Sequence, residues 1–127
     1  MPNATDFQTS EKLSPLSARD VIAAYFGFQI RVAPREGTAT VGTTAVQVTK
    51  HANQRVAVTF GNNGSNLIVV GFGPNVSTTQ GYPVAPNSFL SFTWFLDGEL
   101  VLYDFWAISG TASQTLYVCQ SILQVVN

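Results

Sequence analysis

Apolar and polar residues alternate along several short stretches of this chain with the two-residue period of a β-strand. Within residues 55–72, Val56, Val58 and Phe60 alternate with Arg55, Ala57 and Thr59, and residues 67–70 form a continuous apolar run. The first pattern is typical of a half-buried strand, and the second of a strand covered on both faces. The Gly-Asn-Asn-Gly sequence between them can reverse the chain, because Gly and Asn tolerate positive φ. We therefore predict that residues 55–72 form one β-hairpin at the centre of the fold.

Similar patterns predict further strands before this hairpin. Residues 28–32 alternate and are expected to end at Ala33-Pro34, because proline cannot donate a ladder hydrogen bond. Residues 35–43 are rich in Gly and Thr, which indicates either a loop or a weak edge strand and a possible boundary of the main sandwich. Residues 46–49 alternate again and form the last strand expected before the hairpin.

After the hairpin, residues 73–87 contain three prolines and two glycines, which predicts a structured excursion rather than a central strand. Strands are then predicted at 89–96, 99–102, 103–109 and 114–126, with Asp97-Gly98 as a two-residue hairpin turn. Such short strands, separated by turn signals at intervals of about 8–12 residues, indicate an all-β protein. The predicted fold is an antiparallel β-sandwich of jelly-roll-like character.

The N-terminal region differs from this pattern. Ser17 can cap a short helix at 18–26 with Asp20 three residues later, and Gly27 can end it. Residues 1–16 are mostly polar and aperiodic, with Phe7 and Leu13 as large apolar groups. We predict an extended arm over 1–16, lying on another subunit, and a single sandwich domain over 17–127 that includes the helix. The alternative is that the arm packs on its own domain or on a neighbouring molecule.

Two strands carry large apolar residues on both faces. Along residues 89–96 one face is expected to meet the core and the other face something else. In the strand at 103–109, Trp106 shares its face with Asp104 and Ile108, whereas Phe105 shares the other face with Tyr103 and Ala107. Burying Asp104 would be costly, which favours Phe105 inward. We nevertheless predict Trp106 inward, because Asp104 can reach water or a backbone N–H at the end of the strand. A solvent-facing Trp106 would instead be a candidate anchor for a partner.

Composition indicates one domain with a sizeable core and a surface that partners cover. The chain has 127 residues, of which 46% are apolar and 12% aromatic, whereas only 10% are charged. The net charge of −1 and the low charge content are unfavourable for a free soluble monomer. All six basic residues lie within the first 55 positions, interspersed with acids, so no nucleic-acid-binding patch is expected. No signal-peptide pattern and no apolar run of about 18 residues are present, so we expect a cytosolic protein that does not enter membranes.

Candidate catalytic and ligand-binding residues are few. The late acids Asp97, Glu99 and Asp104 are explained better as turn and solvated residues than as a catalytic pair, and a weak cation site is a minor alternative. His51 is expected to be an exposed turn residue, and Cys119 a buried structural thiol without a partner. No nucleotide-binding or hydrolase motif is present. We therefore predict a non-enzymatic protein without catalytic, cofactor or metal residues.

A series of motifs follows in order along residues 46–126. These are Arg55 at a strand start, Asn62 and Gly64 in a turn, Gly71 at a strand end, Val76 to Thr79 followed by Gly81 and Pro83, Pro86, Trp106-Ala107-Ile108, and Leu116 with Val118. In this order and spacing the segment resembles a small β-sandwich module of structural proteins from tailed bacteriophage virions. The chain departs from that family where Gly98-Glu99-Leu100 comes early, and the residues before 35 lie outside the resemblance.

The resemblance implies a capsid decoration (cement) protein that binds and stabilises the phage head surface. It implies assembly in the bacterial cytoplasm, location in the virion, a homotrimer, and the major capsid protein or another virion protein as partner. The candidate partner-binding residues are Phe7, Leu13, Tyr82 and Trp94. The alternative is a carbohydrate- or receptor-binding module of a phage fibre or tail, with Tyr82, Trp94 and Tyr103 as a stacking platform. Aromatics in a row along a solvent-filled groove would favour that alternative, and aromatics facing a neighbouring subunit the structural one.

Overall fold

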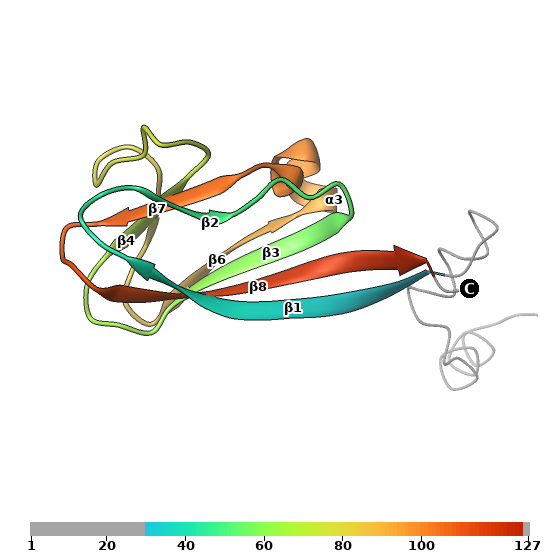
Figure 1. The fold of residues 1–127 in the computed structure, drawn as a ribbon, viewed down its shortest axis with the longest axis horizontal. Coiled ribbons are helices and arrows are strands. Elements are labelled where there is room, and N and C mark those ends of the chain that lie inside the picture. The colour runs from blue at the N-terminus through green and yellow to red at the C-terminus, as the bar shows by residue number, and fades with distance from the viewer. Residues whose placement is uncertain (1–29, 126–127) are drawn as a thin grey trace, which may run out of the picture. The chain divides into compact units, whose positions relative to one another are not determined.

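The structure, a computed structural model, describes residues 30–125, which form two packed β-sheets (Figure 1). The β1 sheet contains, in order, β1 (Ile30–Val41), β8 (Gln114–Val125), β3 (Arg55–Asn62) and β6 (Ser88–Thr93). The β2 sheet contains, in order, β2 (Val46–Thr49), β7 (Phe105–Ser109), β4 (Ile68–Gly71) and β5 (Tyr82–Val84). The predicted all-β sandwich is thus confirmed.

The connections between consecutive strands cross from one sheet to the other, except for that from β4 to β5, which pair with each other. Such crossing between two four-stranded sheets is the arrangement of a jelly roll, as the sequence predicted. By its internal contacts the chain divides into a unit of residues 33–122, which carries most of the sandwich, and a unit of 1–32 with 123–127. The predicted division at residue 16 stays a prediction, because the arm over 1–16, the helix at 18–26, Phe7 and Leu13 lie outside the described residues.

The predicted hairpin at 55–72 is wrong, because β3 and β4 belong to different sheets. The side chain of Asn62 explains the change of sheet. It is fully buried, its Nδ2 donates to the carbonyl oxygens of Asn66 and Val84, and its Oδ1 accepts from the Gly64 N–H. These bonds hold the chain in an arch between the sheets. They also place β4 between β5 and β7, where all four of its residues are buried, as its apolar run predicted.

The strand predicted to end at Ala33-Pro34 instead continues to Val41 as β1. Since β1 is an edge strand, the N–H that Pro34 lacks is not required for pairing on its free side. The weak-edge-strand interpretation of residues 35–43 is therefore correct as far as Val41.

The predicted hairpin turn at Asp97-Gly98 is also wrong. Residues 94–102 form a short helix α3 (Trp94–Asp97) followed by a 3₁₀ helix η1 (Gly98–Leu102), between β6 and β7. Thr93 Oγ1 accepts from the Leu96 N–H at 3.3 Å, and the Asp97 carboxylate accepts from the Thr93 N–H at 2.8 Å. Asp97 therefore caps a helical turn from within it rather than forming a hairpin turn.

The core lies between the two sheets. Its buried members are Val41, Val58, Phe60, Ile68, Val70, Val84, Phe92, Val101, Phe105, Ala107, Leu116 and Val118. The ring of Phe105 is central, with centroids 5.0 Å from Phe60, 5.1 Å from Phe92 and 5.2 Å from Phe72. Phe105 and Ala107 are both 0% exposed.

The prediction that Trp106 faces this core is wrong by one residue of register. Trp106 and Ile108 are half-buried on the outer face of β7, opposite Gly71 and Val69 of β4. The segment 72–81 folds back over Gly71 and Val69. It packs so closely that a Cβ added on Gly71 would meet Val76, and one added on Gly81 would meet Val69. The outer face is thus partly covered and accommodates a tryptophan. Asp104 sits just before β7 and accepts from the His51 N–H, as expected of its place at the strand end.

Candidate functional site

The predicted partner-binding residues are separated by the fold. Tyr82 lies on β5 and is 42% exposed, whereas Trp94 lies in α3 and is 47% exposed. The rings of Tyr82 and Tyr103 both pack edge-on against Phe72, with centroid distances of 6.0 and 6.1 Å. The two tyrosines therefore belong to the aromatic packing at one end of the core, and the structure does not bring Trp94 into it.

The most exposed apolar residues form an apolar turn, which we define as Trp94–Leu96. Phe95 is 95% exposed and Leu96 86% exposed. Two adjacent large apolar side chains with this exposure are unusual for the surface of a monomer and are typical of an interaction site. Sequence reasoning identified Trp94 but missed Phe95 and Leu96, which it placed in a strand.

The apolar turn is held in one conformation by its surroundings. The reciprocal bonds of Thr93 and Asp97 close it on one side, and Gly98 leaves it at φ 60°. Val101 of η1 is fully buried and fixes the following segment to the core. Binding through such an ordered turn loses less conformational entropy than binding through a mobile one.

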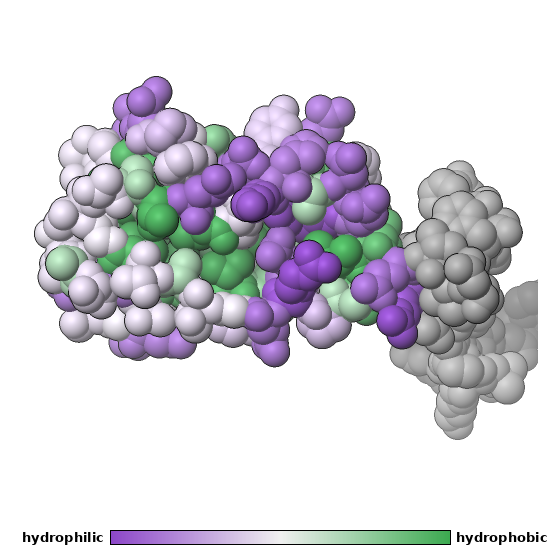
Figure 2. All heavy atoms as spheres, viewed as in Figure 1, coloured by the Kyte–Doolittle hydropathy of each residue, from purple (hydrophilic) through white to green (hydrophobic). Residues whose placement is uncertain are grey.

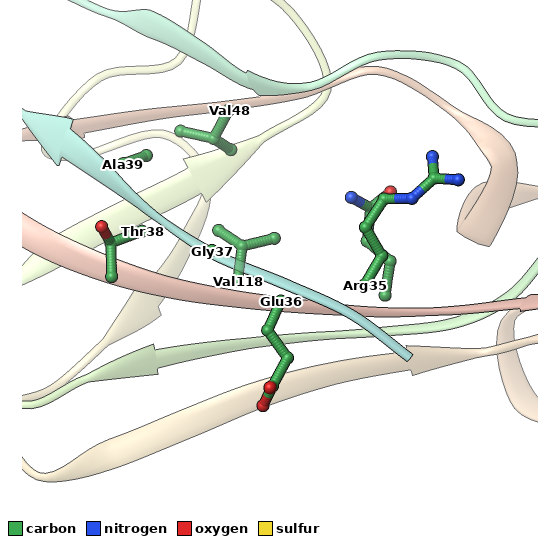
Figure 3. A pocket seen from close by; sticks show the side chains of 8 residues that line it. Arg35, Glu36, Gly37, Thr38, Ala39, Val48 and Val118 are labelled. Atoms are coloured by element: carbon green, nitrogen blue, oxygen red, sulfur yellow. The ribbon is translucent and has the colours of Figure 1, made fainter. Parts of the chain in front are cut away.

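A second feature is a cavity of about 110 Å³ between the edge strands β1 and β2, which we call the β1–β2 slot. It is lined by Arg35, Glu36, Gly37, Thr38, Ala39, Val48, Val118 and Gln120. Figure 2 shows hydrophobic residues in the hollow between these two strands. In Figure 3 the side chains of Ala39, Val48 and Val118 point into one space, while Glu36 points to the other side of β1.

A third feature is a groove of about 420 Å³ beside the segment 72–81. Its lining includes the rings of Phe72 and Tyr82 and the side-chain amides of Asn75 and Gln80. Aromatic rings next to amides can hold a polar ring-shaped ligand, so this groove bears on the carbohydrate alternative. Trp94 and Tyr103 are not part of its lining.

Arg55 is a buried charge that sequence reasoning placed on the outside of the strand. It is 1% exposed, and a bulge between Arg55 and Ala57 turns its side chain inward. Its guanidinium donates to the carbonyl oxygens of Lys50, Val101 and Tyr103 and to Gln120 Oε1. Burial lowers the pKa of Arg55, while the charge of Asp104 opposes that shift. Because these bonds all end within the domain, the role of Arg55 is structural.

The remaining chemistry-bearing residues lie apart from these features. Cys119, predicted to be buried, is only half-buried, and it lies on the outer face of β8 between the inward-facing Val118 and Gln120. The Tyr117 hydroxyl donates to the Glu36 carboxylate, which holds the pKa of Tyr117 above its usual 10.0. His51 is exposed, as predicted. Within residues 30–125 no three His, Cys, Asp or Glu side chains gather as metal ligands, and no helix has the length and apolar character needed to cross a membrane.

The sequence matches no protein-family model and no curated protein. Among solved structures, it is similar to a chain of Bacillus endospore appendages, described as a novel family of disulfide-linked pili. The identity is 19%, the similarity covers 77% of this chain and 89% of that chain, and the TM-score is 0.47. A similarity of this degree does not carry the appendage's function over to this chain.

Proposed function

We propose that this protein is a non-enzymatic structural subunit that joins a larger assembly through its apolar turn. The observation that carries the proposal is the exposure of Phe95 and Leu96, at 95% and 86%, on a capped turn. Covering each of these side chains would stabilise a complex by about 1.5–3 kcal/mol. The low charge content of 10% also supports a surface that partners cover.

The role that we favour within this class is decoration of a tailed-phage head. Its support is the resemblance of residues 46–126 to virion modules. In this role the protein is assembled in the bacterial cytoplasm, acts as a homotrimer in the virion, and binds the major capsid protein or another virion protein. In this role Asp97 and Asp104 serve the fold, since each accepts a hydrogen bond from a backbone N–H.

The test is incorporation into particles. Particles purified from producing cells are expected to contain the protein, and electron microscopy of them to show it on the surface. Phe95→Asp is expected to reduce its amount per particle at least tenfold by quantitative mass spectrometry, because a charge would be buried in the contact. The matched control is Phe89→Asp, since Phe89 is also exposed, at 73%, but lies on β6 outside the turn. A protein found only in the soluble fraction, and never with particles, would contradict the proposal.

Carbohydrate binding is the second candidate, and the groove beside residues 72–81 favours it. Tyr82 presents a partly exposed ring next to the amides of Asn75 and Gln80. Against it, the Tyr82 ring already packs edge-on against Phe72 and Phe92. Saturable binding of a glycan that Tyr82→Ala abolishes, without any change in particle incorporation, would favour this function over the first.

A further inference from the structure

We propose that the apolar turn of one copy inserts into the β1–β2 slot of a second copy, so that subunits join head to tail. This inference rests on the proposed structural function and names both the partner and the two surfaces. It is carried by the shape of the slot and the apolar side chains of Ala39, Val48 and Val118 within its mixed lining, by the exposure of the turn, and by the charges beside each.

The slot exists because the inward-facing residues of β1 are too small to close the sandwich at this edge. Val41 of β1 is fully buried, but the inward positions before it are Ala39 and Gly37. An added Cβ on Gly37 would meet no atom within 4 Å, so this position faces open space. Of the buried core residues, Val118 lines the slot and is 6% exposed, so the slot reaches the margin of the core.

The opposite wall of the slot is apolar and incompletely covered. Val46, two residues before Val48 on β2 and outside the slot's lining, pairs with the core-facing Ala107 and is itself 37% exposed. Val48 is only partly buried, although it packs against the core. Filling this edge with an apolar side chain would be favourable, because the inward-facing valines would lose their contact with solvent.

The apolar turn has the form that such a slot accepts. Phe95 and Leu96 project from an ordered turn, and the slot of about 110 Å³ has room for one side chain with a second lying across its rim. Insertion would cover apolar surface on both copies at once. Among residues 30–125 no other segment covers either surface, because Phe95 and Leu96 are exposed and Gly37 faces open space.

Charges beside the two surfaces are complementary. The turn is followed by Asp97 and Glu99, and α3 and η1 contain no basic residue. Asp97 is engaged by the Thr93 N–H, which leaves the exposed Glu99 to face a partner. At the rim of the slot Arg35 is exposed, whereas Glu36 points to the opposite face and accepts from Tyr117. Pairing of Glu99 with Arg35 of the second copy would set the orientation of insertion.

The contact joins two different surfaces of the same chain, and in a head-to-tail arrangement it is heterologous. After two copies have joined, one turn and one slot remain free, so that growth continues into an open chain or closes into a ring. A closed two-fold dimer would require two such contacts at once, the turn of each copy in the slot of the other, and a dimer that grows no further would overturn the head-to-tail arrangement.

The experiment is sedimentation velocity on full-length variants at micromolar concentration. Phe95→Asp replaces the inserting apolar side chain with a charged one, and Gly37→Leu fills the slot. Each variant alone is expected to weaken self-association at least tenfold. An equimolar mixture of the two is expected to form a species of two subunits that grows no further, because it contains one intact turn and one intact slot. The matched controls are Phe89→Asp and Gly110→Leu, since Gly110 also faces open space. Both controls are expected to associate as the wild type does.

A charge-swap pair keeps the test decisive if Gly37→Leu does not fold. Arg35 and Glu99 are both exposed, so neither Arg35→Glu nor Glu99→Arg burdens the core. Each variant alone is expected to associate more weakly than the wild type. In the mixture, both contacts between unlike variants carry opposite charges, whereas contacts between like variants stay repulsive, so recovery in the mixture supports this pairing.

Several outcomes would overturn the inference. If Phe95→Asp abolishes association while Gly37→Leu leaves it unchanged, the turn docks elsewhere, and the proposed function stands without this contact. If the mixture of the two variants stays monomeric, the contact is not heterologous. A wild type that is monomeric at all concentrations but enters particles excludes a second copy as the occupant. A wild type that neither associates nor enters particles removes the proposed function as well.

Discussion

At the scale of single residues, Arg55 joins several separate segments of the domain. Its guanidinium bonds the carbonyl of Lys50 before β3, those of Val101 and Tyr103 around η1, and Gln120 of β8. The ring of Phe105 lies 5.9 Å from the guanidinium carbon. A guanidinium, with five donors in one plane, can bond several segments at once, which a lysine cannot. Arg55 therefore links parts of the chain that the sheets do not join.

We expect Arg55→Met to lower the free energy of unfolding by about 3 kcal/mol or more. Methionine retains the apolar volume of the stem but leaves one buried and two part-buried carbonyls without this donor, at about 1–3 kcal/mol for a buried one. Urea unfolding measures the loss. The control Arg35→Met changes an exposed arginine and should fall within about 0.5 kcal/mol of the wild type. If Arg55→Met changes the free energy of unfolding as little as Arg35→Met does, water bonds these carbonyls in place of the guanidinium.

The residue scale also explains two errors of sequence reasoning. Strict alternation places Arg55 outside, but the bulge before Ala57 adds one residue and reverses its direction. Bulges have no apolar pattern of their own, so the sequence could not reveal this one. For Trp106, the alternation was correct and the choice of face was wrong. The high cost of burying Asp104 had indicated the correct face, whereas the covered outer face that accepts Trp106 depends on residues 72–81.

At the scale of elements, the segment 72–81 acts as a lid over the outer face of β4. Val69 is 2% exposed and Val76 8% exposed, although both lie outside the inter-sheet core. Gly81 permits this packing, with φ 146° and with Val69 Cγ1 2.6 Å from the place of an added Cβ. The prolines and glycines predicted that residues 73–87 form an excursion, and the apolar run of β4 predicted that this strand is covered on both faces. Neither pattern indicated that part of the excursion itself covers β4.

We expect Gly81→Ala to lower the free energy of unfolding by about 1–3 kcal/mol, because the Cβ would be strained in φ and would collide with Val69. Thermal unfolding followed by circular dichroism provides the measurement. Gly73→Ala is the matched control in the same segment, since its Cβ would meet nothing within 4 Å. Equal melting temperatures for the two variants would contradict the described packing of Gly81.

Element types were predictable where the pattern was local. The strands β2, β3, β4 and β8 lie close to their predicted positions, because alternation and apolar runs depend on neighbouring residues. The turn signals at Asn62–Gly64 and Asp97-Gly98 indicated a change of direction, but the hairpins predicted from them are not formed. In the structure, side-chain hydrogen bonds set the direction that the chain takes: Asn62 bonds Val84 of β5, and Asp97 bonds Thr93.

At the scale of the whole molecule, strand order was beyond sequence reasoning. Composition and spacing predicted a sandwich, but the pairing of β3 with β8 joins Phe60 to Val118 and Asn62 to Leu116, residues far apart in the chain. The β1–β2 slot was unpredictable for the same reason, because Gly37, Val48 and Val118 come from three separate strands. Of the candidate site, sequence reasoning anticipated Trp94 and a second apolar face over residues 89–96, but not the helical turn that presents Phe95 and Leu96.

We expect this pairing pattern to make refolding slow. Among consecutive described strands only β4 and β5 pair, so nearly all contacts between strands require closure of long loops. Domains dominated by such contacts refold in milliseconds to seconds, compared with microseconds to milliseconds for helical bundles. Stopped-flow fluorescence of Trp94 and Trp106 after dilution from urea gives the rate. Complete refolding within microseconds would show that local contacts dominate instead.

The position of β8 between β1 and β3 has a consequence for synthesis on the ribosome. Both neighbours of β8 are translated before it, so β1 has no sheet partner and β3 keeps one edge unpaired until β8 emerges. At about 5–20 residues per second, the stretch between β3 and the end of β8 takes several seconds to translate. Throughout that interval the nascent chain presents an unpaired strand edge to its surroundings, including neighbouring nascent chains of the same protein. Cellular yield therefore depends on how well that edge is shielded during translation, as well as on the stability of the finished sandwich.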